Sequence, residues 1–213
     1  MKKRKLQLPK GYLSYSQIQL WKSDKKRYIE LYFNNRTELR MSNAGMEYGK
    51  VVAEALEKEE NTGDLMTDSA MLLLTKYDVR DQEIATEIKT KECIVPVIGR
   101  PDTLDSLTKA FREYKTGKGK WTQNKAQNHP QMRFYAMLIY LKYGKLTKEA
   151  WLDWIETEKT EGGIKPTGRV ESFHVEISMS DILDTIKETV NVGKEIEIAF
   201  ASHETVPEIG YDD

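Results

Sequence analysis

The sequence contains very little cysteine. Cys93 is the only one among 213 residues. One thiol cannot form an intramolecular disulfide, and it is too few for a cysteine-based zinc site or a cysteine-ligated iron–sulfur cluster. This scarcity favours a protein of a reducing compartment, and we expect it in the cytoplasm.

Long hydrophobic runs are also lacking. The longest, Phe134 to Leu141, spans eight residues, whereas a helix that crosses a bilayer needs about 20. The basic residues 1–5 are followed by no apolar segment of the kind found in signal peptides. The sequence therefore predicts neither a membrane protein nor a secreted one. With 39% hydrophobic and 31% charged residues, residues 1–213 have the composition and length of a single globular domain.

The net charge of −1 hides an uneven distribution along the chain. Residues 1–50 hold twelve Lys and Arg against four Asp and Glu, a balance of +8, whereas residues 161–213 hold four against twelve, a balance of −8. A positive segment of this size would attract a polyanion such as a nucleic acid. The alternative is that these charges belong to ordinary solvated helix faces.

The spacing of hydrophobic residues changes from helical to strand-like and back, which predicts an α/β protein. We expect a helical part over about 12–78, a sheet and a helix over about 81–145, and strands with a final helix over about 148–201. The expected helices cover 14–33, 43–59, 67–77, 130–143 and 180–200, and the expected strands cover 82–90, 92–98, 100–106, 110–116, 150–157 and 170–178.

Chemically active side chains are concentrated between positions 99 and 135. Glu113 and Lys115 are two residues apart, so on a strand they point to the same face. If Asp102 lies on a strand that pairs with theirs through a turn at 105–109, its carboxylate reaches that face too. Two carboxylates beside a lysine form an oxygen site of the kind that Mg²⁺ prefers, with positions left for water and phosphate. The lysine can then orient or deprotonate an attacking water.

In this arrangement the sequence resembles the PD-(D/E)XK nuclease superfamily. The matching elements are Pro101-Asp102, Glu113-Tyr114-Lys115, the Q-x-x-x-Y element Gln131-Met132-Arg133-Phe134-Tyr135, and the opening stretch Ser14 to Tyr28. The last two are similar to features of the RecB-like exonuclease branch, which includes the CRISPR-adaptation nucleases. The resemblance covers about residues 12–145 and leaves the C-terminal third without a motif.

The resemblance implies a restriction-endonuclease-like fold, with a mixed central β-sheet flanked by helices. It also implies a Mg²⁺- or Mn²⁺-dependent deoxyribonuclease, most simply a stand-alone DNA exonuclease of recombination, repair or phage replication. Asp102, Glu113 and the backbone carbonyl of Tyr114 would hold the metal, and Lys115 would activate the attacking water.

Gln131 and Tyr135 would complete this site from the following helix. Because that helix is apolar nearly all round, its glutamine needs buried hydrogen-bond partners, which a metal-bound water or a phosphate would supply. The alternative is a capping glutamine and a core tyrosine. In the same way, Asp102 and Glu113 could be surface carboxylates that pair with Arg100.

Two departures from the branch affect the expected ligands. Relatives with an iron–sulfur cluster carry a cysteine near Ser23, so the cluster is expected to be absent and the chain is more similar to phage-type members. Many members also have a histidine ligand on the second helix, where this chain has Ala53. Glu54 could replace it as a ligand, or Glu57 one turn further along, and the alternative is that both are ordinary exposed glutamates of the helix.

Basic residues near these motifs are the candidates for DNA binding. Lys118 and Lys120 lie in a glycine-rich loop that lacks the spacing of a nucleotide-binding loop, so we interpret it as a contact to the phosphate backbone. Lys26 and Arg27 on the first helix are further candidates.

Partners and location follow from the resemblance as expectations. They are a DNA substrate, a recombination or single-strand-annealing partner protein, a homo-oligomer, and the cytoplasm of a bacterium or phage-infected cell. The main alternative is a nuclease-fold protein that binds nucleic acid or another protein without cutting, which the missing histidine favours and the intact Asp102, Glu113 and Lys115 oppose. A nucleotide-binding enzyme is a third reading, but it has no adequate phosphate loop.

Overall fold

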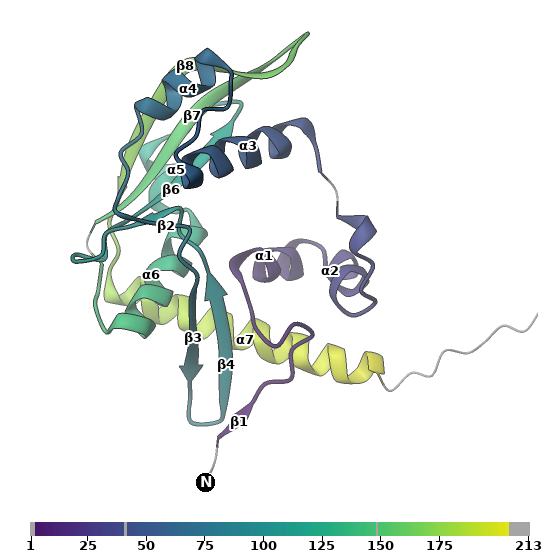
Figure 1. Ribbon diagram of the computed structural model, residues 1–213. Coiled ribbons are helices and arrows are strands. Elements are labelled where there is room, and N and C mark those ends of the chain that lie inside the picture. Colours follow the sequence, from purple (N-terminus) through teal and green to yellow (C-terminus); the bar gives the residue numbers. More distant parts are fainter. Residues whose placement is uncertain (1–2, 41, 148, 205–213) are drawn as a thin grey trace, which may run out of the picture.

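The computed structural model describes residues 3–40, 42–147 and 149–204 (Figure 1). The helices are α1 (Tyr15–Ser23), α2 (Lys25–Tyr32), the short 3₁₀ helix η1 (Thr37–Leu39), α3 (Ala44–Lys58), α4 (Leu65–Leu72), α5 (Gln123–Gln127), α6 (Pro130–Tyr143) and α7 (Met179–Glu204). The strands are β1 (Arg4–Lys5), β2 (Val79–Arg80), β3 (Ile84–Lys89), β4 (Cys93–Gly99), β5 (Thr103–Leu104), β6 (Phe111–Gly117), β7 (Ala150–Thr160) and β8 (Gly163–Val175).

The strands form two mixed sheets flanked by helices, as expected for an α/β protein. One sheet has the order β1-β4-β3 and the other has the order β2-β5-β6-β7-β8. The pairs β1–β4 and β6–β7 are parallel, and the remaining pairs are antiparallel. The mixed sheet predicted from the resemblance is thus present, but it is divided into two parts.

The four strands predicted between residues 82 and 116 do not form one continuous sheet. They are divided between the two sheets. β3 and β4 form a hairpin in the small sheet, whereas β5 and β6 form one in the large sheet. The strand expected over 100–106 is only Thr103–Leu104. It ends there because Asp105 forms a turn, in which its carboxylate accepts hydrogen bonds from the backbone of Leu107 and Thr108 at 3.0 and 2.6 Å.

Helix α6 is the centre of the main core. Seven of its residues are buried, as the apolar composition of this segment predicts. The helix contacts β3 and β4 of the small sheet, β7 of the large sheet, and α7, which crosses the lower part of the molecule in Figure 1. α6 therefore fixes the two sheets relative to each other, with its N-terminal end directed at their junction.

The first predicted helix is interrupted. Asp24 ends α1 and caps α2, because its carboxylate accepts a hydrogen bond from the backbone N–H of Arg27 at 2.9 Å. Further along, α3 packs with α4 on the large sheet in a second, smaller core that includes Val52, Leu56 and Ile155.

The uneven charge is compensated inside the fold. Arg4 pairs with Glu197 at 2.5 Å, Lys22 pairs with Glu188, and Lys25 pairs with Glu195 at 3.1 Å, all on α7. The acidic last helix thus lies against the basic N-terminal segment, so part of that segment's charge is neutralised within the molecule. None of the helices in the described residues is both long enough and apolar enough to cross a membrane.

Candidate active site

The carboxylate of Asp102 lies at the start of the hairpin between β5 and β6. Thr103 pairs with Arg112 across the two strands, which brings the preceding aspartate level with the next residues of β6. Its Oδ2 accepts a hydrogen bond from the backbone N–H of Tyr114 at 2.5 Å. The hairpin expected from the sequence therefore forms, with its turn between Asp105 and Lys109.

Four side chains form a hydrogen-bonded network beside Asp102. The Nζ of Lys115 donates to Oε1 of Glu113 at 2.6 Å and to Oε1 of Gln131 at 2.8 Å. The Nε2 of Gln131 donates to the same Glu113 oxygen at 2.7 Å and to the hydroxyl of Tyr135 at 2.9 Å. The five residues that the sequence nominated for chemistry are thus in one place, and the interpretation of Gln131 as a simple cap is not needed.

Close packing of α6 on β4 holds this network in position. A Cβ atom at Gly99 would lie 2.7 Å from Cδ1 of Leu138 and 2.9 Å from Cε1 of Tyr135. The absence of a side chain at the end of β4 therefore allows α6 to approach closely enough for Gln131, one turn before Tyr135, to reach Lys115.

The two carboxylates lie in an unusual electrostatic environment. Glu113 is 4% exposed, and its Oε2 is buried without a hydrogen-bond partner in the described residues. Burial raises the pKa of Asp102 well above its usual value, and the neighbouring Glu113 raises it further. Burial also raises the pKa of Glu113, although Lys115 acts in the opposite direction. Two carboxylates held together away from water require a positive partner, and Lys115 satisfies only one oxygen.

These features fit a divalent cation. The unpartnered Oε2 of Glu113 and the raised pKa of Asp102 are the signs of a site that lacks positive charge. No group of three or more His, Cys, Asp or Glu side chains in residues 3–40, 42–147 and 149–204 is arranged to hold a metal. Two carboxylates with further positions for water and phosphate are the donor set typical of Mg²⁺, which seldom has an all-protein cage.

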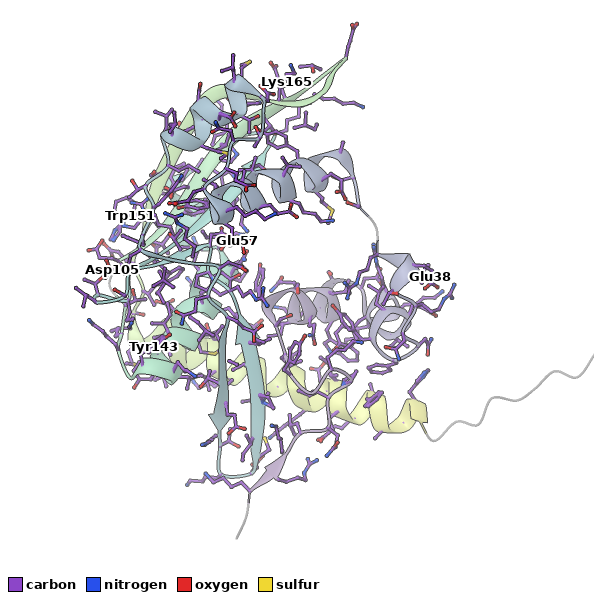
Figure 2. The ribbon with its side chains drawn as sticks, viewed as in Figure 1. Glu38, Glu57, Asp105, Tyr143, Trp151 and Lys165 are labelled. Atoms are coloured by element: carbon purple, nitrogen blue, oxygen red, sulfur yellow. The ribbon has the colours of Figure 1, made fainter. Side chains whose placement is uncertain are left out.

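The structure does not bring Glu54 to this site. Ala53 lines two cavities that also contain Asp102, a large one of about 600 Å³ and a small one of about 50 Å³. Glu57 lines the small cavity, whereas Glu54 is exposed and lines neither. Figure 2 shows Glu57 near the C-terminal end of α3. Helical spacing explains the difference, because positions 53 and 57 are one turn apart on the same face and position 54 is rotated away from it.

The large cavity, which we call the α3 cleft, lies between α3, β6 and the β7–β8 hairpin. Its lining includes Lys50, Lys115, Lys118 and Lys159. The predicted DNA contact Lys118 is therefore on the cleft, whereas Lys120 is exposed and is not part of its lining. α3 comes close to β6 here, since a Cβ at Gly49 would lie 3.1 Å from the Oγ1 of Thr116.

Lys26 and Arg27 lie elsewhere. They line a separate hollow with the carboxylates of Glu30 and Glu38, and Arg27 donates to the backbone carbonyl of Leu39 at 3.2 Å. The structure thus does not join these two candidates to the network around Lys115.

Two residues near the network were not nominated from the sequence. Burial, with Glu113 as a further cause, raises the pKa of Tyr15 to about 12. Burial together with Lys115 and Lys125 lowers the pKa of His129 to about 4, so this histidine is neutral at physiological pH. The sequence signal for Tyr15 was its place in the family-like opening stretch, whereas nothing in the sequence marked His129 beyond its position before Pro130.

Mixed sheets flanked by helices, with paired carboxylates and a lysine at their junction, define a protein of the restriction-endonuclease-like fold. The sequence pattern that defines the PD-(D/E)XK nuclease superfamily matches residues 15–192. The chain therefore belongs to this superfamily, and the resemblance based on Asp102, Glu113 and Lys115 is confirmed at that level.

One solved structure supports this fold, and a second is less similar. An exonuclease candidate from Eubacterium rectale superimposes with a TM-score of 0.51 at 10% identity, over 87% of this chain and 82% of that one. LHK-Exo in complex with dAMP gives a TM-score of 0.49 at 14% identity, over 92% of this chain and 93% of that one. At 10% identity, the likeness to the Eubacterium rectale structure shows the fold alone. No protein with a curated description matches the chain in sequence.

Proposed function

We propose that this protein is a metal-dependent deoxyribonuclease that hydrolyses phosphodiester bonds with Asp102, Glu113 and Lys115. The observation that carries the proposal is the position of the Lys115 ammonium, 2.6 Å from Glu113 and on the lining of a cleft that also exposes Asp102. Membership of a nuclease superfamily supports the same reaction class. The arrangement also opposes the alternative of a fold that only binds, because a binding surface does not require two buried carboxylates with raised pKa values.

The metal would be held by Asp102, Glu113 and the backbone carbonyl of Tyr114. When bound, Mg²⁺ or Mn²⁺ would lower the pKa of a coordinated water and neutralise charge that develops at the phosphate. The Tyr114 backbone also fixes Asp102, since its N–H donates to Oδ2 at 2.5 Å.

Lys115 is positioned to orient the attacking water. Its ammonium has three donors, of which two are used by Glu113 and Gln131. The third has no partner among the described residues and can contact a water or a phosphate oxygen in the α3 cleft, where Lys115 is part of the lining. The charge of the ammonium also offsets negative charge that accumulates on the phosphate as the bond forms.

Gln131 and Tyr135 serve as positioning residues. Gln131 accepts a hydrogen bond from Lys115 and donates one to Glu113, so it fixes the lysine and the carboxylate relative to each other. Burial raises the pKa of Tyr135, which remains a neutral phenol and accepts a hydrogen bond from Gln131. Removal of Gln131 would loosen both Lys115 and Glu113, and removal of Tyr135 would act on them through Gln131.

The finer assignment is to a RecB-like exonuclease of recombination, repair or phage replication, acting as one nuclease domain over residues 1–213. The opening stretch that contains Tyr15 and the spacing of Gln131 and Tyr135 support the branch. This part of the proposal rests on resemblance, because a fold alone does not determine the substrate.

An assay with two DNA forms tests the proposal. The protein is incubated with end-labelled linear DNA and with covalently closed circular DNA, in Mg²⁺, in Mn²⁺ and in EDTA. We expect degradation of the linear form that requires a divalent metal, and no cutting of the closed circle. Cutting of the circle would replace the exonuclease assignment with an endonuclease. No cutting of either DNA with either metal would favour the alternative, a nuclease-fold protein that binds nucleic acid without hydrolysing it.

A further inference from the structure

The α3 cleft has an apolar surface as well as a charged one. Met46 on α3 is 51% exposed although it lies on the cleft lining, and Ile164 on β8 faces it from the hairpin. Tyr114 and Ala53 continue this surface towards Asp102. An exposed methionine and an isoleucine on the lining of one cleft offer an apolar contact to a bound ligand.

Lysines surround this apolar surface. Lys118 and Lys159 line the cleft, and neither has a carboxylate within 4.0 Å in the part of the chain that the structure describes. Lys50 lines it too and pairs with Glu47 at 3.2 Å in an exposed ion pair of low strength. Figure 2 shows Lys165 near the tip of the hairpin that forms one wall. The lining, which also includes the carboxylates of Asp102 and Glu158, therefore has more lysines than carboxylates and suits a ligand with negative charges next to apolar groups.

We infer that the α3 cleft binds single-stranded DNA and not the intact double helix, an inference that rests on the proposed deoxyribonuclease function. A single strand exposes the faces of its bases beside its phosphates, so the bases can cover Met46 and Ile164 while the phosphates contact Lys118 and Lys159. A duplex encloses its bases and presents phosphates and groove edges, which would leave the apolar surface uncovered. The volume of the cleft, about 600 Å³, is that of a small-molecule pocket and accommodates a few nucleotides of one strand.

A second cavity allows the strand to continue past the catalytic network. This cavity of about 320 Å³ is lined by Tyr12, Tyr15 and Gln131 among others. Gln131 accepts a hydrogen bond from Lys115, which lines the α3 cleft, so the two cavities adjoin at the catalytic network. Tyr12 is 37% exposed there and offers an aromatic face to a base. The phosphate between two nucleotides then lies over Asp102 and Lys115.

Binding measurements test this inference separately from catalysis. Fluorescence anisotropy with Ca²⁺ in place of Mg²⁺ compares a labelled single strand of about 20 nucleotides with a blunt duplex of the same sequence. The wild-type protein is expected to bind the single strand at least about tenfold more tightly. Met46→Ser should weaken single-strand binding about fivefold or more, because a base that covers the methionine side chain buries apolar surface worth that much, and it should leave duplex binding unchanged.

Met66→Ser is the matched control. Met66 is 49% exposed, close to the value for Met46, and it lies in the first turn of α4 away from the cleft lining. It should bind both DNA forms as the wild type does. Equal affinity of the wild type for single strand and duplex would overturn the inference, as would unchanged single-strand binding by Met46→Ser. Failure of the proposed function has a different signature, namely no metal-dependent cleavage of either DNA with binding preserved.

Discussion

Divalent metal should stabilise this protein through Asp102 and Glu113, and replacing Asp102 with asparagine should remove most of that stabilisation. Without metal, the fold holds two neighbouring carboxylates whose pKa values are both raised by burial. Their charged forms therefore destabilise the folded state at neutral pH. A cation that binds both carboxylates in the folded state, and only weakly in the unfolded one, reverses this effect.

The size of the effect follows from linkage. A ligand at about one hundred times its dissociation constant stabilises the folded state by about 2.7 kcal/mol. In a chain of 213 residues each kcal/mol raises the melting temperature by roughly 2 to 4 °C. The wild type should therefore melt about 5 to 10 °C higher in saturating Mn²⁺ than in EDTA. Asp102→Asn can still accept the hydrogen bond from Tyr114, so it should fold. Its melting temperature should rise on addition of Mn²⁺ by only a small fraction of the rise in the wild type.

The same carboxylates set the direction of the pH dependence. Because burial raises the folded-state pKa of Asp102 above its usual value, the folded state binds more protons than the unfolded state over the range between the two pKa values. Stability in EDTA should therefore rise as the pH falls through the folded-state pKa. Asp102→Asn should show less of this rise than the wild type.

Differential scanning calorimetry of the wild type and Asp102→Asn, each with Mn²⁺ and with EDTA, measures these shifts. Asp184→Asn is the control, because Asp184 is 69% exposed on α7 and pairs only with Lys187 at the surface. It should keep the full metal response. A shift in Asp102→Asn as large as that of the wild type would show that the metal binds elsewhere, and the reasoning from the raised pKa values would be refuted.

Three further predictions concern single side chains. Lys115→Arg keeps the charge but not the compact ammonium, so single-turnover cleavage should fall at least about tenfold, and an unchanged rate across the pH range would make Lys115 a surface lysine. Ala53→His should lower the Mn²⁺ concentration needed for half-maximal stabilisation, because Ala53 lines both cavities that contain Asp102, and no change would place the metal away from α3. Asp153→Ala should destabilise the fold by about 3 to 5 kcal/mol in urea unfolding, because it leaves Arg112 charged and buried without its partner at 2.8 Å; a loss below 1 kcal/mol would mean that water reaches Arg112.

The sequence was sufficient to predict the hairpin that carries Asp102 and Glu113. Alternation along β6 and the polar residues at 105–109 are local signals, and both elements form where those signals lie. The buried helix that holds Gln131 was predictable for the same reason, since Pro130 fixes its start and an apolar run follows.

Features that depend on competing local signals or on contacts distant in sequence were not predictable. The carboxylate of Asp24 competes with continuation of the first helix, and only its hydrogen bond to Arg27 shows that the cap prevails. The division into two sheets depends on β1 and on the parallel pairing of β6 with β7, which no local pattern encodes. Compensation of the basic N-terminal segment by α7 depends on packing over more than 160 residues of chain, as between Lys22 and Glu188.

The choice between Glu54 and Glu57 shows the limit within a correctly predicted helix. Both lie on α3, and a shift of one residue rotates a side chain by about 100°, so the position of the helix on the sheet decides which one faces Asp102. Gly49, which allows α3 to approach Thr116, sets that position. It places Ala53 and Glu57 on the side of the site.

The central claim is that Asp102, Glu113 and Lys115 form one metal-dependent hydrolytic site. Single-turnover cleavage of end-labelled single-stranded DNA by the wild type and by Glu113→Gln, each with Mg²⁺ and after addition of EDTA, tests it most directly. Glu113→Gln preserves the shape of the side chain and removes one of the two carboxylates, so cleavage should fall by at least about a hundredfold while DNA binding in Ca²⁺ persists. Cleavage by Glu113→Gln at the wild-type rate, or wild-type cleavage that continues in EDTA, would contradict the account.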